Sequence, residues 1–161
     1  MSLAQIQCMD ARISIFQIET VTSVNDSLTL GFRFRVKDSP LRTDGQMVVW
    51  QAHLCHNMQS DKFRYAYHEN YQFGIFKTLL GDETKPDVPL ASACFALAMG
   101  GVREYIWFVT SRATNGPFRL PAVVPQLQTD EDPETQMKGW THYLIPDIAL
   151  KKHSTETSER P

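Results

Sequence analysis

Apolar and polar residues alternate along the first half of the chain, and this period of two predicts β-strands. The alternation is sharpest between Leu28 and Lys37, where every second residue is apolar and most of the others are polar or basic. One face of this strand is therefore expected to be buried and the other to be basic. A weaker alternation, from Ile13 to Ile18, predicts a short strand that is partly covered on both sides.

The same period continues in residues 46–58 and 62–77. The loop 38–45 and the short polar turn 59–61 separate these strands. Connections this short favour antiparallel neighbours, because a parallel pair needs a crossover of about a dozen residues. We expect these last three strands to be antiparallel neighbours.

The pattern becomes helical after a chain-breaking segment at residues 81–89. Two adjacent apolar stripes run along residues 90–112 with the helical period of about 3.6 residues. The glycine pair at residues 100–101 weakens a helix by about 1 kcal/mol per glycine, so we expect the helix itself to start near Val102. The stripes consist of Val102, Ile106 and Val109, and of Tyr105 and Phe108.

The C-terminal part begins where residues 115–117 stop this helix. An acidic connector follows, and Asp132-Pro133 predicts the start of a short helix over residues 134–144. We expect one α+β domain over residues 1–150, with strands first and helices after, and a disordered polar tail at 151–161.

Composition excludes several classes of protein. The chain has 161 residues, of which 42% are apolar and 21% charged, as in an ordinary globular domain. Its 16 basic and 18 acidic residues give no overall attraction to nucleic acid or to an anionic membrane. The uncharged run at residues 88–102 is too short to span a bilayer. No secretory signal is visible, and three widely spaced cysteines suit a reducing compartment, so we expect a cytoplasmic protein.

The sequence shows no pattern typical of a catalytic or metal-binding site. His53, Cys55 and His56 lie close together, but on a strand His56 points away from the other two, so at most two of them meet one ion. Cys94 lies in an alanine-rich apolar run and is expected to be packed. Neither a phosphate-binding glycine loop nor a nucleophile elbow is present. We therefore predict no catalytic residues, no metal, no cofactor and no enzyme.

The helix raises a question about burial. A helix that is apolar around most of its circumference needs cover on more than one side, and a single sheet supplies only one. A second copy of the chain is the most economical cover. We therefore predict an obligate homo-oligomer, a dimer or a tetramer, with Val102, Tyr105, Ile106, Phe108 and Val109 at its interface.

Several segments, in this order and spacing, resemble the SecB family of export chaperones. Residues 73–76, Phe-Gly-Ile-Phe, are similar to the Gly-Gly-Ile-Phe that ends the family's last strand. Residues 117–124 are similar to its Pro-x-Leu-x-Leu-x-Pro-Val segment. The resemblance covers about residues 6–124 and includes Arg103, Glu104, Ile106, Ser111, Arg112 and Thr114. It implies a four-stranded antiparallel sheet packed on a long helix, subunits paired through edge strands and helices, and ATP-independent capture of unfolded polypeptide.

The resemblance also implies where clients bind. A chaperone of this kind needs exposed apolar grooves that accept many sequences. The family lines these grooves with its second strand, its helix and the loop after the helix. The alternative, that all of the matching residues are simply core, stays open. The matching residues of the strand and the loop are Leu28, Leu30, Phe32, Leu120, Val123 and Val124.

Two departures from the family concern partners. Tyr67 and Glu69 replace the solvent-facing Leu-x-Glu that docks the translocase motor SecA, and Ile13 and Gln17 replace its acidic partners. Docking to SecA is therefore not expected. The strand pattern alone buries Tyr65 and Tyr67, whereas the match exposes them. We follow the match and predict a partner surface of Tyr65, Tyr67 and Glu69.

These features lead to a functional hypothesis. We expect a chaperone dedicated to an antitoxin in a toxin–antitoxin–chaperone module of the phage-defence type. The alternatives are a general export chaperone, and a non-chaperone adaptor or nucleic-acid-binding module that uses the basic face of Arg33, Arg35 and Lys37.

Overall fold

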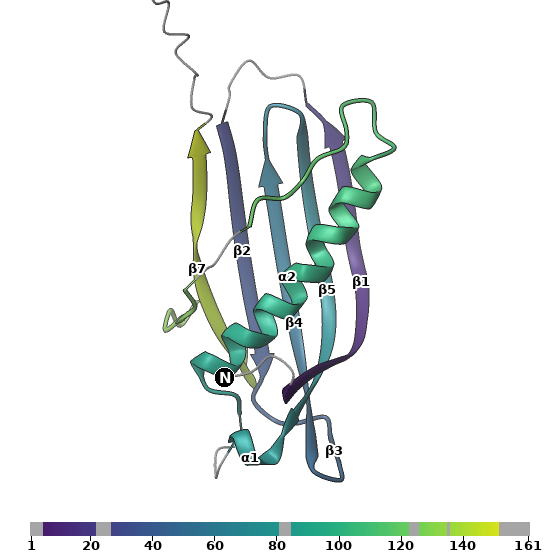
Figure 1. The fold of residues 1–161 in the computed structure, drawn as a ribbon. Coiled ribbons are helices and arrows are strands. Elements are labelled where there is room, and N and C mark those ends of the chain that lie inside the picture. The colour runs from purple at the N-terminus through teal and green to yellow at the C-terminus, as the bar shows by residue number, and fades with distance from the viewer. Residues whose placement is uncertain (1–4, 22–26, 81–84, 123–125, 135, 152–161) are drawn as a thin grey trace, which may run out of the picture.

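A single antiparallel sheet with one long helix lying across one of its faces makes up the fold (Figure 1). The computed structural model describes residues 5–21, 27–80, 85–122, 126–134 and 136–151. The elements are β1 (Ile6–Thr20), β2 (Ser27–Lys37), β3 (Arg42–Asp44), β4 (Met47–Gln59), β5 (Phe63–Phe76), α1 (Lys77–Leu80), α2 (Val88–Thr110), β6 (Gln128–Thr129) and β7 (Trp140–Lys151).

The sheet has seven strands in the order β1-β5-β4-β2-β7-β6, with β3 paired to β4. The four strands predicted from the alternation are present and adjacent, so the α+β class is confirmed. The count of four is wrong, because β7 pairs with β2 along its length, from Lys37 opposite Trp140 to Ser27 opposite Lys151. The edge of β2 that a four-stranded sheet would leave open is therefore occupied by the chain's own C-terminal strand.

The helix expected at residues 134–144 is replaced by a turn and β7. Gly139 adopts φ 84°, which glycine tolerates without strain, and the strand begins at the next residue. Within β7, Tyr143 and Ile145 are buried while Leu144 is exposed, which is the period of a strand. Pro146 lies in the register shift opposite Gly31, where its missing N–H interrupts no ladder. The predicted tail starts at residue 151, but Lys151 ends β7, and the rest of the predicted tail, residues 152–161, lies outside the described residues.

Helix α2 is confirmed as a helix, but the expected start near Val102 is wrong. It begins at Val88, because the Asp87 side chain accepts a hydrogen bond from the Leu90 N–H at 2.9 Å and Pro89 occupies the first turn. The helix continues through the glycine pair, since a buried stripe on either side holds it against the sheet. Neither helix of the described ranges has both the length and the apolar character that crossing a membrane requires.

The chain turns back over the sheet after α2 (Figure 1). The Thr110 hydroxyl donates to the Ile106 carbonyl at 2.7 Å and accepts from the Phe118 N–H at 2.9 Å. A Cβ at Gly116 would lie 1.5 Å from the Thr110 carbonyl oxygen, so only glycine permits this close approach. Leu120 is consequently buried in the core.

Candidate functional site

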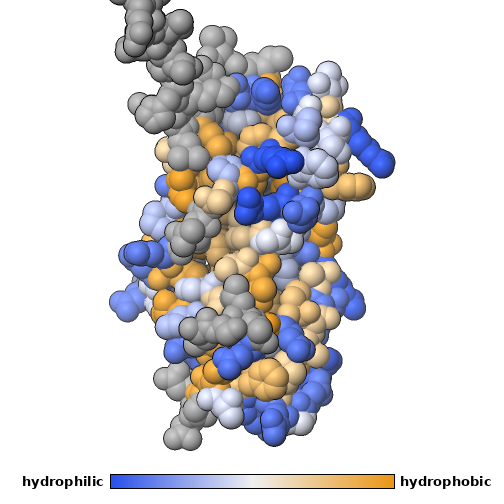
Figure 2. All heavy atoms as spheres, viewed as in Figure 1, coloured by the Kyte–Doolittle hydropathy of each residue, from blue (hydrophilic) through white to orange (hydrophobic). Residues whose placement is uncertain are grey.

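The outer side of α2 carries exposed aromatic residues. Trp107 is 39% exposed and Phe108 is 55% exposed. Figure 2 shows hydrophobic side chains among hydrophilic ones on this side of the molecule. A shallow cavity of about 410 Å³ lies between the helix and the returning segment. Its lining consists of Gly100, Arg103, Glu104, Trp107, Arg119 and Leu120.

Charged groups border this aromatic surface. The Arg119 guanidinium lies 5.7 Å from the centre of the Trp107 ring, and that of Arg112 lies 5.3 Å from the Phe108 ring. In each of these cation–π contacts the guanidinium lies over one ring face, and both aromatic residues stay partly exposed. We call Arg103, Trp107 and Arg119, which line this cavity, the helix groove.

The residues predicted for an oligomer interface divide between the inside and the outside of the subunit. Val102 and Ile106 are fully buried against the sheet, so their assignment to an interface is wrong for the subunit as folded. Tyr105 is half-buried, with its ring 5.2 Å from Phe16. Only Phe108 and the half-buried Val109 reach the outer surface, because the sheet already covers one full stripe of the helix.

The residues predicted to line a client groove lie mostly in the core. Leu30 and Phe32 are buried, and the Phe32 ring lies 5.9 Å from that of Phe95 on α2. Leu120 is buried as well, and Leu28 is half-buried. The expectation that these residues form exposed walls is therefore wrong for Leu30, Phe32 and Leu120. Val123 and Val124 lie outside the described residues.

The predicted partner surface is also buried. Tyr65, Tyr67 and Glu69 have exposed fractions of 2%, 1% and 7%, because they lie on the face of β5 that the helix covers. The Glu69 carboxylate accepts hydrogen bonds from the hydroxyls of Tyr67 and Tyr71. Burial raises the pKa of both tyrosines. The period-two pattern, which buries these tyrosines, is correct, and the exposure carried over from the resemblance is wrong.

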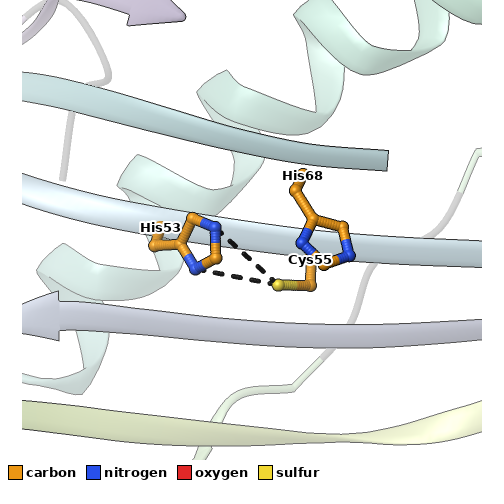
Figure 3. Close-up of side chains that lie close together, drawn as sticks. All are labelled: His53, Cys55 and His68. Carbon is orange, nitrogen blue, oxygen red and sulfur yellow. Dashed lines mark hydrogen bonds between the residues drawn. The ribbon is translucent and has the colours of Figure 1, made fainter. Parts of the chain in front are cut away.

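The opposite face of the sheet carries a cluster of His53, Cys55 and His68. Cys55 and His68 are directly opposite each other on β4 and β5, and His53 lies two residues before Cys55 on the same face. The Cys55 Sγ lies 3.7 Å from His53 Nδ1 and 3.9 Å from His53 Nε2. One ligand atom from each of the three residues falls within 4.8 Å of the other two. Figure 3 shows the side chains together on the side of the sheet away from α2.

Burial and charge act on this cluster together. Burial, and then the charges of Arg35 and His68, lower the pKa of His53 to about 4. Burial raises the pKa of Cys55, while Arg35 and Arg33 act in the opposite direction. The cluster also borders a cavity of about 480 Å³ that reaches His142 on β7. It is thus half-buried, and small molecules or ions can reach it from the cavity.

His56 behaves as the strand pattern predicts and points to the other face. Its ring stacks on Phe32, with 4.4 Å between ring centres, and its Nδ1 is hydrogen-bonded to the Tyr65 hydroxyl at 2.8 Å. Burial lowers the pKa of His56 to about 3. It is a satisfied core residue and not part of the cluster. His68, which the sequence reasoning did not consider, takes the place of a third ligand.

Two solved structures share this arrangement of sheet and helix. One is a SecB-like chaperone from Mycobacterium tuberculosis, in complex with a ChAD peptide from the HigA1 antitoxin. The two chains are 16% identical, with 74% of this chain and 88% of that chain covered and a TM-score of 0.53. The fold is SecB-like. In this SecB-like sheet the helix groove and the cluster lie on opposite sides.

The second structure is a protein of unknown function from Streptococcus agalactiae. It is 12% identical, the alignment covers 73% of this chain and 97% of that chain, and the TM-score is 0.52. No protein-family model matches the sequence, and no curated protein matches it at a significant level. The likeness therefore establishes the fold alone.

Proposed function

We propose that the protein is an ATP-independent chaperone that holds aggregation-prone polypeptide in the cytoplasm. The observation that carries the proposal is the exposed aromatic helix groove on a SecB-like fold. Large apolar side chains left exposed around a cavity are typical of surfaces that bind other proteins. The groove offers apolar contact with little hydrogen-bond specificity, which suits clients of varied sequence.

The preferred client in this proposal is an antitoxin of a toxin–antitoxin–chaperone module. A similar structure holds an antitoxin peptide, which supports this choice over general export. Arg103 and Arg119 outnumber Glu104 among the charged residues that line the groove, so an apolar segment flanked mainly by acidic residues would complement it. Contacts of this size are weak for one subunit, since ordering the client offsets most of the gain from burial.

A homo-oligomer would repeat these weak contacts and raise the overall affinity. We propose that copies meet on the side of α2 that carries Gly101 and Phe108, beside the helix groove. Phe108 supplies an exposed apolar side chain there, and a Cβ at Gly101 would meet no atom within 4 Å. Two helices can approach closely across such glycines. Light scattering tests this assembly: Phe108→Lys should shift the mass toward a monomer, and Leu144→Lys, on the opposite face, should not.

The chaperone activity is tested by suppression of client aggregation. Trp107→Ser should reduce the suppression several-fold, because it removes the aromatic wall of the groove. Leu144→Ser is the matched control, since Leu144 is 51% exposed on β7 and away from the groove. Equal activity of the two variants would contradict the assignment of the groove.

The client is tested by isolating the protein from its native cell with its bound partners. A single small, unstable antitoxin as the main partner supports the proposal. SecA together with many presecretory proteins would instead indicate general export. RNA retained in a salt-dependent manner, without suppression of aggregation, would indicate a nucleic-acid-binding module.

A further inference from the structure

The cluster of His53, Cys55 and His68 has a ligand set that the proposed chaperone activity does not use. Two imidazoles and a thiolate are ligands that zinc prefers, and three protein ligands are enough for a tetrahedral site with one open position. The three side chains come from two adjacent strands held in register by the main-chain ladder. Their positions are therefore fixed by the sheet and not by a loop.

The separations fit a single ion. Zinc–sulfur and zinc–nitrogen bonds of about 2.3 and 2.0 Å place tetrahedral ligand atoms about 3.5 Å apart. The distances from Cys55 Sγ to the ring nitrogens of His53 are 3.7 and 3.9 Å, and the whole set lies within 4.8 Å. The His53 and His68 rings lie 5.9 Å apart between centres, so a modest rotation brings one nitrogen of each toward a common point.

The surroundings suit a partly enclosed ion. The cluster is half-buried, which limits competition from water, and the cavity beside it leaves the fourth position open. Arg33 and Arg35 line this cavity and favour the thiolate form of Cys55, although they also repel a cation. Asp130 and Glu134 line the same cavity and offset part of that repulsion.

We propose that His53, Cys55 and His68 bind one zinc ion on the open face of the sheet, with solvent in the fourth position. Binding releases the Cys55 thiol proton to water, and the thiolate and two imidazole nitrogens each donate an electron pair to the metal. The ion ties β4 to β5 on the face of the sheet opposite α2.

The test is zinc binding to the full, untagged chain after removal of metal with a chelator. All proteins carry His153→Asn, which removes a histidine outside the described residues. Competition with a chromogenic chelator should give one zinc per chain. Zinc at about 100 times its dissociation constant should raise the Tm by about 5 to 10 °C.

The ligands are tested by variants. Cys55→Ser and His68→Asn should each weaken zinc binding by more than about 10-fold and, at the same zinc concentration, reduce the rise in Tm to about half or less. The controls are Cys8→Ser, which removes an exposed thiol elsewhere, and His142→Asn, which removes a histidine of the same cavity. Both controls should keep the affinity. Equal losses in all four variants, or in none, would overturn the proposal.

A measurement on the protein that keeps all three proposed ligands covers the case in which a ligand variant fails to fold. Cobalt should replace zinc and give a thiolate-to-cobalt charge-transfer band that disappears when zinc is added. Cobalt bound without this band would exclude Cys55 as a ligand and overturn the proposal.

Discussion

The two faces of the sheet place the same kinds of residue in different chemical settings. On the face covered by α2, polar groups are buried and satisfied: Glu69 accepts from two tyrosines, and His56 stacks on Phe32. On the open face, His53, Cys55 and His68 are half-buried beside charged groups and a cavity. His53 and His56 lie three residues apart on β4, and residues an odd number of positions apart on a strand point to opposite faces. This alone makes His56 a core residue and His53 a candidate ligand.

The pKa values of the two histidines express the same difference. Burial alone lowers the pKa of His56 to about 3. Burial also comes first for His53, but the charges of Arg35 and His68 add to it and lower the pKa to about 4. The covered face therefore acts on His56 through desolvation, and the open face acts on His53 through desolvation and charge together.

The largest effect on the free energy of unfolding is expected from substitutions of neighbouring residues on β4. Leu54→Ala removes a fully buried side chain from the covered face and should lower the free energy of unfolding by about 2 to 5 kcal/mol. Cys55→Ala, on the open face, should cost less than about 1 kcal/mol in metal-free protein. Urea unfolding measures both. Equal costs would mean that the open face is covered in solution.

The next effect is a loss of stability in acid. In the unfolded state the pKa of His56 has its ordinary value near 6.5. The folded state keeps the ring neutral down to about pH 3, so the unfolded state binds more protons below pH 6.5. The free energy of unfolding should fall by about 2 kcal/mol between pH 7 and pH 5 on account of this residue.

Substitution isolates that contribution. His56→Phe should remove about 2 kcal/mol of the fall between pH 7 and pH 5, measured by urea unfolding at each pH, and the part due to His53, whose pKa is also lowered, should remain. Replacing His142 by Gln should leave most of the slope, because the His142 ring is more exposed. An unchanged slope in His56→Phe would show that another group controls the acid response.

Local patterns were sufficient to predict β2, β4 and β5 as antiparallel neighbours, part of β1, and the C-terminal half of α2. Period-two runs of ten or more residues specify a strand and its faces with no knowledge of its partner. They could not predict β7, whose pairing with β2 joins residues about a hundred positions apart. The Asp132-Pro133 signal for a helix start was a local preference that this long-range pairing overrode.

The candidate site was predictable in part. Strand parity placed His53 and Cys55 on one face and His56 on the other, as found. The missing step was the register of the β4–β5 hairpin. A turn centred on residues 60–63 pairs Gln59 with Arg64, and counting back along both strands places His68 opposite Cys55. The exposed fraction of Phe108 depends on the tilt of α2, which no local pattern specifies.

The smallest predicted effect distinguishes the cause of the pKa shift of His53 from that of His56. Arg35→Gln removes a charge that lowers the pKa of His53 and that does not contribute to the shift of His56. NMR titration of metal-free protein should show the pKa of His53 moving upward while that of His56 stays in place. The shift should remain smaller than the part due to burial, which is the leading cause.

The substitution itself should change stability little, within about 0.5 kcal/mol. The Arg35 Nε is buried without a hydrogen-bond partner, so removing it is favourable. This gain offsets the lost contact between the guanidinium and the Trp140 ring, whose centre lies 4.7 Å away. Arg12→Gln is the matched control, because Arg12 pairs with Asp10 on β1 and should leave both histidines unchanged. If Arg35→Gln changed the pKa of His53 and that of His56 equally, the charge of Arg35 would act through the sheet. The two faces would then not be electrostatically separate.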